Sequence, residues 1–83
     1  MVNVLCEPGE VIDKALELAG RINVNAPLAV RATREAVLRG AQVDDLEGIR
    51  IAVDLFRPVA RSEDAKEGPL AFVEKRDPEW KAR

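Results

Sequence analysis

An aromatic side chain and two cations lie close together near the C-terminus of this 83-residue chain. Lys75 and Arg76 follow Phe72 by three and four residues, so in a helix the three side chains are neighbours on one face. An apolar ring can pack against an adenine base while nearby cations meet phosphate oxygens. The spacing alone favours a simpler interpretation, in which Phe72 is a core residue and the cations balance the negative end of the helix dipole.

Three carboxylates form a second group with possible chemistry. Glu63, Asp64 and Glu67 are close in sequence, and paired carboxylates can transfer protons when one of them is desolvated. They follow Ser62, a typical helix N-cap, so we expect them to be exposed and to stabilise the helix dipole. Cys6 has no basic neighbour to activate it, and we expect a small buried apolar residue. We therefore assign no catalytic and no metal-binding residue.

The composition excludes several functional classes. The net charge of −2, from 13 basic and 15 acidic residues, gives no electrostatic support for binding to nucleic acid or to an anionic membrane. The chain has no His, the commonest general base and zinc ligand, and no glycine-rich phosphate loop, so we expect no cofactor. No apolar run could span a bilayer. A single Cys cannot form an internal disulfide, which favours a reducing, cytoplasmic setting.

The apolar pattern predicts a mainly α-helical chain that begins with a short strand. Residues 2–6 are rich in β-branched types and precede Pro8 and Gly9, so we expect residues 1–9 to form the end of a core strand and a turn. Apolar residues at helical spacing then predict three helices, at 10–25, 26–40 and 44–60. Residues 10–83 are expected to form one helical domain.

The helix expected at residues 44–60 is apolar over more than half of its circumference. Such a helix should be buried on two sides, the second of them by another subunit or by a core that this chain lacks. Pro58 removes a backbone donor, so the helix should kink or stop near Arg57.

The last helical region should begin at Ser62, which can act as its N-cap. Gly68 and Pro69 should interrupt it after one turn, because a proline disfavours helical dihedrals at the residue before it. Residues 79–83 are expected to form a charged tail that carries Trp80, the only Trp of the chain.

Several short motifs at fixed spacing resemble the C-terminal end of the enoyl-CoA hydratase/isomerase (crotonase) superfamily. They are Ser62-Glu63-Asp64, Glu67-Gly68, Ala71-Phe72, Glu74-Lys75-Arg76, Pro78 and Trp80. The resemblance covers nearly the whole chain: residues 1–5 resemble the last strand of that family's core, and the three predicted helices resemble the helices that follow it. It stops where the family's catalytic half would lie.

The resemblance implies the C-terminal helical part of a crotonase-like fold, present as a fragment or a truncated gene product. In complete members this part mediates assembly into trimers or dimers of trimers and helps to close the acyl-CoA site, in fatty-acyl-CoA metabolism. The resemblance also implies that Phe72, Lys75 and Arg76 contact the CoA moiety, which makes ligand binding by these residues as well supported as the simpler structural interpretation. We expect the chain to be inactive alone. Two alternatives stay open: a freestanding helical oligomerisation module without catalysis, and a small acyl-CoA-binding helical domain.

Overall fold

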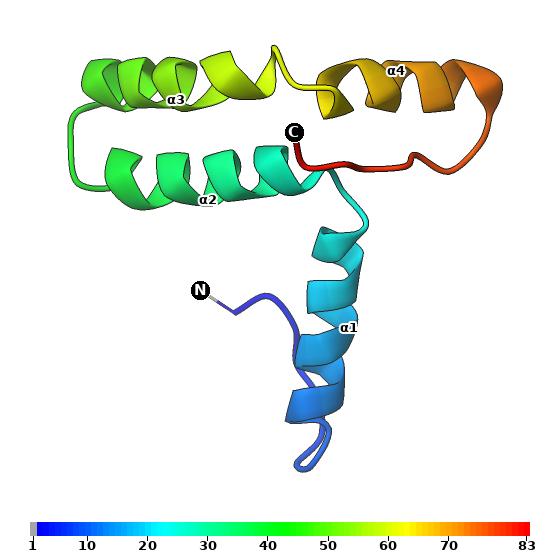
Figure 1. Ribbon diagram of the computed structural model, residues 1–83. Coiled ribbons are helices and arrows are strands. Elements are labelled where there is room, and N and C mark those ends of the chain that lie inside the picture. Colours follow the sequence, from blue (N-terminus) through cyan, green and yellow to red (C-terminus); the bar gives the residue numbers. More distant parts are fainter. Residues whose placement is uncertain (1) are drawn as a thin grey trace.

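Four helices make up the computed structural model, which describes residues 2–83 (Figure 1). They are α1 (Val11–Asn23), α2 (Pro27–Gly40), α3 (Asp45–Val59) and α4 (Asp64–Glu74). Helices α2 and α3 form an antiparallel pair, α4 continues beyond the end of α3, and α1 projects away from the other three. The result is a flat molecule of 44 × 39 × 18 Å. None of these helices has the length and apolar character needed to cross a membrane.

The strand predicted for residues 2–6 is absent from the described part of the chain. Residues 2–10 form an irregular segment with a turn at Pro8 and Gly9, and Gly9 has the positive φ of 97° that glycine adopts at little cost. A strand needs a partner for its backbone N–H and C=O groups, and residues 2–83 contain no other strand that could supply one. Cys6 is exposed, so its predicted burial is also wrong.

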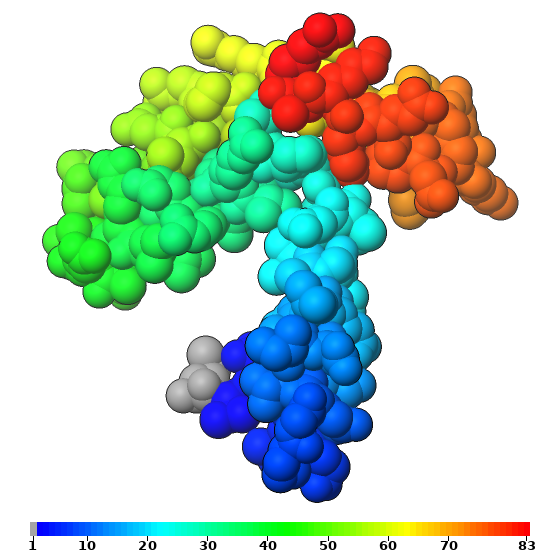
Figure 2. Space-filling model, turned by 60° about the horizontal axis from the view of Figure 1, so that its bottom comes forward, coloured from blue at the N-terminus to red at the C-terminus, as the bar shows by residue number. Residues whose placement is uncertain are grey.

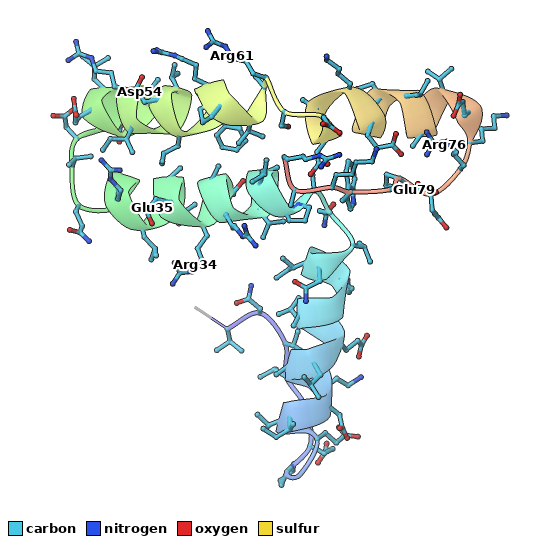
Figure 3. The ribbon with its side chains drawn as sticks, in the orientation of Figure 1. Arg34, Glu35, Asp54, Arg61, Arg76 and Glu79 are labelled. Carbon is cyan, nitrogen blue, oxygen red and sulfur yellow. The ribbon has the colours of Figure 1, made fainter. Side chains whose placement is uncertain are left out.

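Helices α2 and α3 pack side by side and form the main helix-to-helix contact. Ala32 is buried in this contact, and Leu55 and Val59 are partly buried. Charged side chains such as Arg34 and Asp54 point away from it (Figure 3). A small residue of α2 thus lies where the two helices meet.

The boundaries of α3 follow from local chemistry. The Asp44 side chain accepts a hydrogen bond of 3.0 Å from the backbone N–H of Glu47, which satisfies one free donor at the helix start. Pro58 lies in the last turn, and the helix ends at Val59. The expected stop near Arg57 is therefore confirmed to within two residues.

Apolar side chains on α1 and on the outer side of α3 stay exposed within residues 2–83. On α1, Ile12 is 69% and Leu16 is 65% exposed, and no residue of that helix is buried. On α3, Leu46 and Ile49 are 63% and 60% exposed. Figure 2 shows α1 standing clear of the other helices, with the N-terminal segment against one side. The wide apolar arc of α3 thus meets α2 on one side only.

Helix α4 is continuous through Gly68 and Pro69, so the predicted interruption is wrong. The clash that disfavours a helical residue before proline involves its Cβ as well as its N–H, and Gly68 has no Cβ. The absence of a side chain at Gly68 thereby makes the helical conformation accessible, and the only lost backbone bond is the one that Pro69 cannot donate.

Candidate functional site

Ser62 lies between α3 and α4 and fixes the start of α4. Its buried hydroxyl accepts a hydrogen bond of 3.1 Å from the N–H of Ala65 and donates one of 2.7 Å to the carbonyl of Val59. The helix begins at Asp64, two residues after Ser62. The hydroxyl therefore has the capping function that the sequence predicts, and it also binds the end of the preceding helix.

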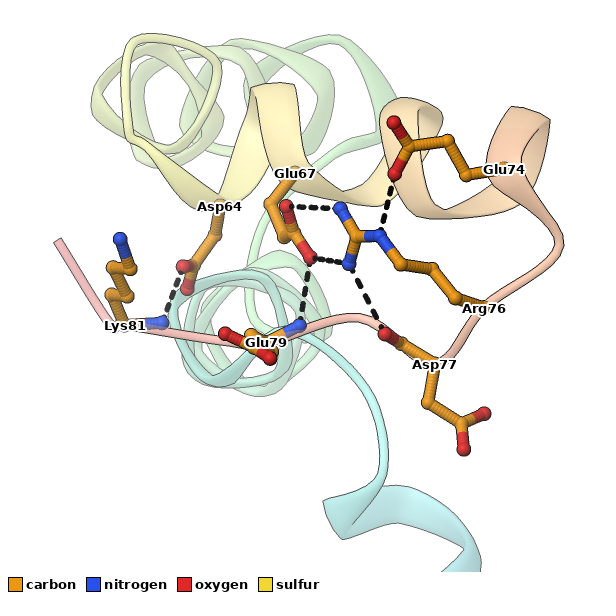
Figure 4. A network of polar contacts seen from close by, with 7 residues as sticks. All are labelled: Asp64, Glu67, Glu74, Arg76, Asp77, Glu79 and Lys81. Carbon is orange, nitrogen blue, oxygen red and sulfur yellow. Dashed lines mark hydrogen bonds and ion pairs between the residues drawn. The ribbon is translucent and has the colours of Figure 1, made fainter.

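The C-terminal segment of residues 77–83 runs back along α4, as Figures 1 and 4 show. Asp64 accepts two backbone hydrogen bonds from this segment, of 2.7 Å from the N–H of Lys81 and 3.0 Å from the N–H of Ala82. The N–H of Glu63 donates to the carbonyl of Arg83 at 2.6 Å. Asp64 is only 3% exposed, so the expectation of an exposed carboxylate is wrong for it. Its burial is tolerated because both oxygens have donors.

Glu67 forms a fork-like ion pair with Arg76. Its two carboxylate oxygens lie 2.5 Å from Nη1 and 3.1 Å from Nη2 of Arg76 (Figure 4). One of these oxygens also accepts a hydrogen bond of 2.8 Å from the N–H of Glu79. The bonds from Arg76, followed by the one from Glu79, lower the pKa of Glu67 to about 2. The Glu67 side chain is 19% exposed, so the predicted exposure is wrong here too.

These bonds decide what Glu67 and Arg76 can do chemically. A carboxyl with so low a pKa stays ionised near neutral pH and has no proton to give as a general acid. The pKa of Arg76 is raised, first by its bonds to Glu67 and then by the bond of 2.6 Å from Nε to Glu74. Both groups therefore act as permanent charges that hold the turn after α4.

Trp80 joins the C-terminal segment to two other parts of the molecule. Its indole Nε1–H donates a hydrogen bond of 2.8 Å to the carbonyl of Val24, the residue directly after α1. Its six-membered ring lies against Gly68, where a Cβ would approach the ring to 3.3 Å. The charged tail predicted for residues 79–83 is therefore docked. The lone Trp next to a glycine-containing helix was the available signal for this contact, but spacing alone does not identify its partner.

The three residues predicted to contact a ligand lie in different environments at the end of α4. Phe72 is on the helix and is 85% exposed. Lys75 has a left-handed conformation, with φ of 55° and ψ of 41°, which ends the helix. Helical spacing does not extend to Arg76, whose guanidinium binds Glu67 and Glu74. The structure thus leaves Phe72 and Lys75 open and occupies Arg76.

A hollow of about 300 Å³ lies between α4 and the C-terminal segment. Its lining is Glu63, Asp64, Lys66, Glu67, Leu70, Arg76, Glu79 and Lys81. Most of its charged groups are already paired with one another or with backbone N–H groups. Within residues 2–83, no cluster of acidic, His or Cys side chains could hold a metal ion.

Comparison with known proteins gives consistent matches over the whole chain. The enoyl-CoA hydratase/isomerase family model matches residues 1–83. A carnitinyl-CoA dehydratase from Salmonella arizonae is 45% identical over 85 residues, covering 98% of this chain and 33% of that protein. One from Proteus mirabilis is 41% identical over 87 residues, covering 100% and 33%.

A solved structure shows the same arrangement of helices. The crystal structure of an enoyl-CoA hydratase from Mycobacterium tuberculosis superimposes with a TM-score of 0.90 at 40% identity, over 99% of this chain and 32% of that one. The chain spans about a third of the length of the curated relatives it matches.

Proposed function

Because the chain belongs to the enoyl-CoA hydratase/isomerase family, we propose that it serves as the helical part of an acyl-CoA-processing protein. In this proposal residues 10–83 are the C-terminal helical domain, which takes part in subunit assembly and helps to close the acyl-CoA site. The groups that perform the reaction lie outside this domain, and the isolated chain is inactive.

The exposed Phe72 ring beside Lys75 is the observation that carries the ligand-binding part of the proposal. Leaving an 85% exposed Phe in water forgoes roughly 1.5–3 kcal/mol of burial free energy, which a bound apolar group or base would recover. Lys75 is exposed and has no ion pair within residues 2–83, so its ammonium is available to a phosphate. The ring and the cation lie at the same end of α4.

Arg76 enters the proposal with a different role from Lys75. A phosphate would have to compete with the carboxylates of Glu67 and Glu74 for its guanidinium. Arg76 also donates a hydrogen bond of 3.2 Å to the carbonyl of Asp77, and this bond fixes the start of the C-terminal segment. We therefore assign the direct contacts with CoA to Phe72 and Lys75, and the support of the turn that presents them to Arg76.

Acyl-CoA binding to a double variant tests this assignment. Phe72→Ala with Lys75→Ala should raise the Kd for butyryl-CoA, measured by calorimetry, about tenfold or more, since one large apolar contact is lost with an ionic one. The matched control is Val73→Ala with Lys66→Ala, which removes the same kinds of group from other exposed positions of α4. Equal affinities of the two double variants would refute the contact, and so would the absence of binding by the unmodified chain.

A separate assay tests the inactivity of the chain. We expect the purified chain to leave crotonyl-CoA unhydrated, followed by the absorbance of its conjugated thioester. The pKa of Glu67 and the backbone bonds of Asp64 commit these carboxylates to structural contacts. Turnover that tracks the chain through purification would overturn this part of the proposal.

The exposed apolar faces favour a second candidate function, a helical oligomerisation module without catalysis. Side chains on α1 and α3, among them Leu16 and Ile49, are more than half exposed. Faces of this kind mark surfaces that another protein covers. Light scattering should give the mass of a discrete trimer or dimer, and a monomer at micromolar concentration would exclude assembly. Assembly without any affinity for butyryl-CoA would leave this candidate alone.

A further inference from the structure

Helix α4 is held in place differently from α2 and α3. Helices α2 and α3 pack along their lengths, and α1 contacts α2, whereas α4 has at most marginal contact with the other helices. It is joined to α3 through the four residues 60–63. A helix with so little packing on its neighbours is expected to change its direction easily unless another segment holds it.

The carboxylates of α4 bind the main chain of the C-terminal segment rather than its side chains. Asp64 accepts hydrogen bonds from the N–H groups of Lys81 and Ala82, and Glu67 accepts one from the N–H of Glu79. Hydrogen bonds to an ionised acceptor are stronger than bonds between neutral groups. Because Asp64 is buried, removing its carboxylate would leave two backbone donors with little access to water.

Trp80 extends these contacts from α4 to the joint between α1 and α2. One edge of its side chain donates to Val24 at that joint, and its ring rests on Gly68 of α4. Trp80 therefore contacts both α4 and the joint between α1 and α2, and no packing between helices fixes the position of these two parts relative to each other. Gly68 is the position on α4 where the ring fits, because a methyl group there would lie 3.3 Å from it.

We propose that residues 77–83 are a strap that fixes the position of α4 relative to the joint between α1 and α2. Asp64, Glu67 and Trp80 are its positioning residues. The consequence for ligand binding rests on the proposed function: if Phe72 and Lys75 contact acyl-CoA, the strap sets the direction in which α4 presents them.

The single Trp makes the strap directly observable in the full chain, because Tyr is absent and Trp80 dominates the fluorescence. Two readings are combined: quenching of Trp80 by acrylamide, and hydrogen exchange of the backbone amides in α4 compared with those in α2 and α3. The test variant is Asp64→Ala. The matched control is Glu74→Gln, which removes a carboxylate that bonds only to Arg76 and to no backbone group of the strap.

Asp64→Ala should increase the quenching of the partly exposed Trp80 by acrylamide and accelerate exchange in α4 about tenfold or more, from the loss of two charge-assisted bonds, with α2 and α3 unchanged. Glu74→Gln should change neither reading. Unchanged exchange in α4 despite a released Trp80 would overturn the proposal, as would an equal loss of protection in all helices. Unchanged quenching would show that Asp64 does not anchor the strap.

Trp80→Ala decides the matter if Asp64→Ala fails to fold, because it removes the bond to Val24 and the contact with Gly68 without changing α4 itself. If the strap holds α4, exchange in α4 should be about tenfold or more faster in this variant, while α2 and α3 keep their exchange rates. Unchanged exchange in α4 would refute the strap.

Butyryl-CoA binding to the same variants separates the two proposals. If the unmodified chain does not bind butyryl-CoA, the proposed function fails, while quenching and exchange still test the strap. If the chain binds and Asp64→Ala releases α4 without weakening binding, the strap stands as a structural device and its effect on ligand binding is refuted.

Discussion

Helices α1 and α4 differ in how far their apolar pattern corresponds to burial of their residues. Helix α1 has a clear apolar stripe along its length, yet none of its residues is buried. Helix α4 has a much weaker stripe, with a glycine and a proline in its middle, yet Asp64 is 3% and Ala71 is 1% exposed. An amphipathic pattern thus shows which face of a helix can be covered, but other parts of the molecule determine whether it is covered.

The difference arises from what lies beside each helix. The N-terminal segment lies loosely against α1, and its valines and leucine stay largely exposed. The C-terminal strap is bound to α4 by paired carboxylates and by one large aromatic side chain. Polar contacts made at a few points therefore immobilise a helix whose apolar pattern is weak.

The largest expected effect that sharpens this comparison is that of Trp80→Ala. We expect a loss of about 2–3 kcal/mol of unfolding free energy, below the cost at a fully buried site because Trp80 is partly exposed. Urea unfolding followed by far-UV circular dichroism measures it. Trp80→Phe keeps a ring on Gly68 but loses the donor to Val24, so its unfolding free energy should lie between those of the unmodified chain and of Trp80→Ala. A loss below about 0.5 kcal/mol for Trp80→Ala would make α4 as independent as α1.

The cap of α4 gives the next largest effect. Ser62→Ala should cost about 1 kcal/mol of unfolding free energy, because the N–H of Ala65 loses its partner and the carbonyl of Val59 keeps only the backbone N–H of residue 62. Ser62→Thr keeps a hydroxyl and should recover most of this loss in the same urea experiment. Equal stabilities of the Ala and Thr variants would show that the hydroxyl does not contribute.

Acid should lower the unfolding free energy through Glu67. This effect should be smaller than that of Ser62→Ala, because the ion pair of Glu67 with Arg76 is partly exposed to solvent. The folded pKa of about 2 lies below the ordinary value of 4.5, so the contribution is complete above pH 4.5 and is lost as the pH falls toward 2. The difference in urea midpoint between the unmodified chain and Glu67→Gln should shrink through this window. Glu17→Gln on α1 removes an exposed pair with Lys14 and serves as the control. A constant difference at all pH values would contradict the low pKa.

The smallest expected effect lies on α1. Leu16 is 65% exposed, so Leu16→Gln should change the unfolding free energy of the monomeric chain by less than about 0.5 kcal/mol. If the face of α1 is covered in an assembly, the same variant should lower the mass measured by light scattering. A large loss of stability at concentrations where the chain is monomeric would show that α1 is covered within the chain, and the contrast with α4 would disappear.

Local sequence signals predicted the helices well, and contacts between distant residues account for what they missed. Apolar spacing acts over a few turns of the chain, and it predicts α1, α2 and α3 nearly to their ends. The break expected at Gly68 did not form, because the rule about residues before proline depends on a Cβ that glycine lacks. The strand expected at residues 2–6 has no partner in the described structure.

The candidate site was predicted only in part, for the same reason. Phe72 and Lys75 are exposed at the end of α4, but their contact with CoA is still a prediction. Asp64 was expected to be exposed because the two N–H groups that donate to it lie 17 and 18 residues further along the chain, beyond the reach of a local pattern. The bond from Trp80 to Val24 spans 56 residues, and no local pattern indicates such a contact.

The use of main-chain donors in the strap sets an unusual rule for which amino acids its positions tolerate. Glu79, Lys81 and Ala82 each contribute an N–H, so their side chains can be exchanged widely without loss of these bonds. Proline is the exception, because it has no N–H to donate. Ala82 excludes it a second time, since its φ of 57° is closed to a proline ring and favours glycine or asparagine. A library of variants at residues 79, 81 and 82 should therefore accept many side chains but no proline, whereas at Trp80 the side chain itself is restricted.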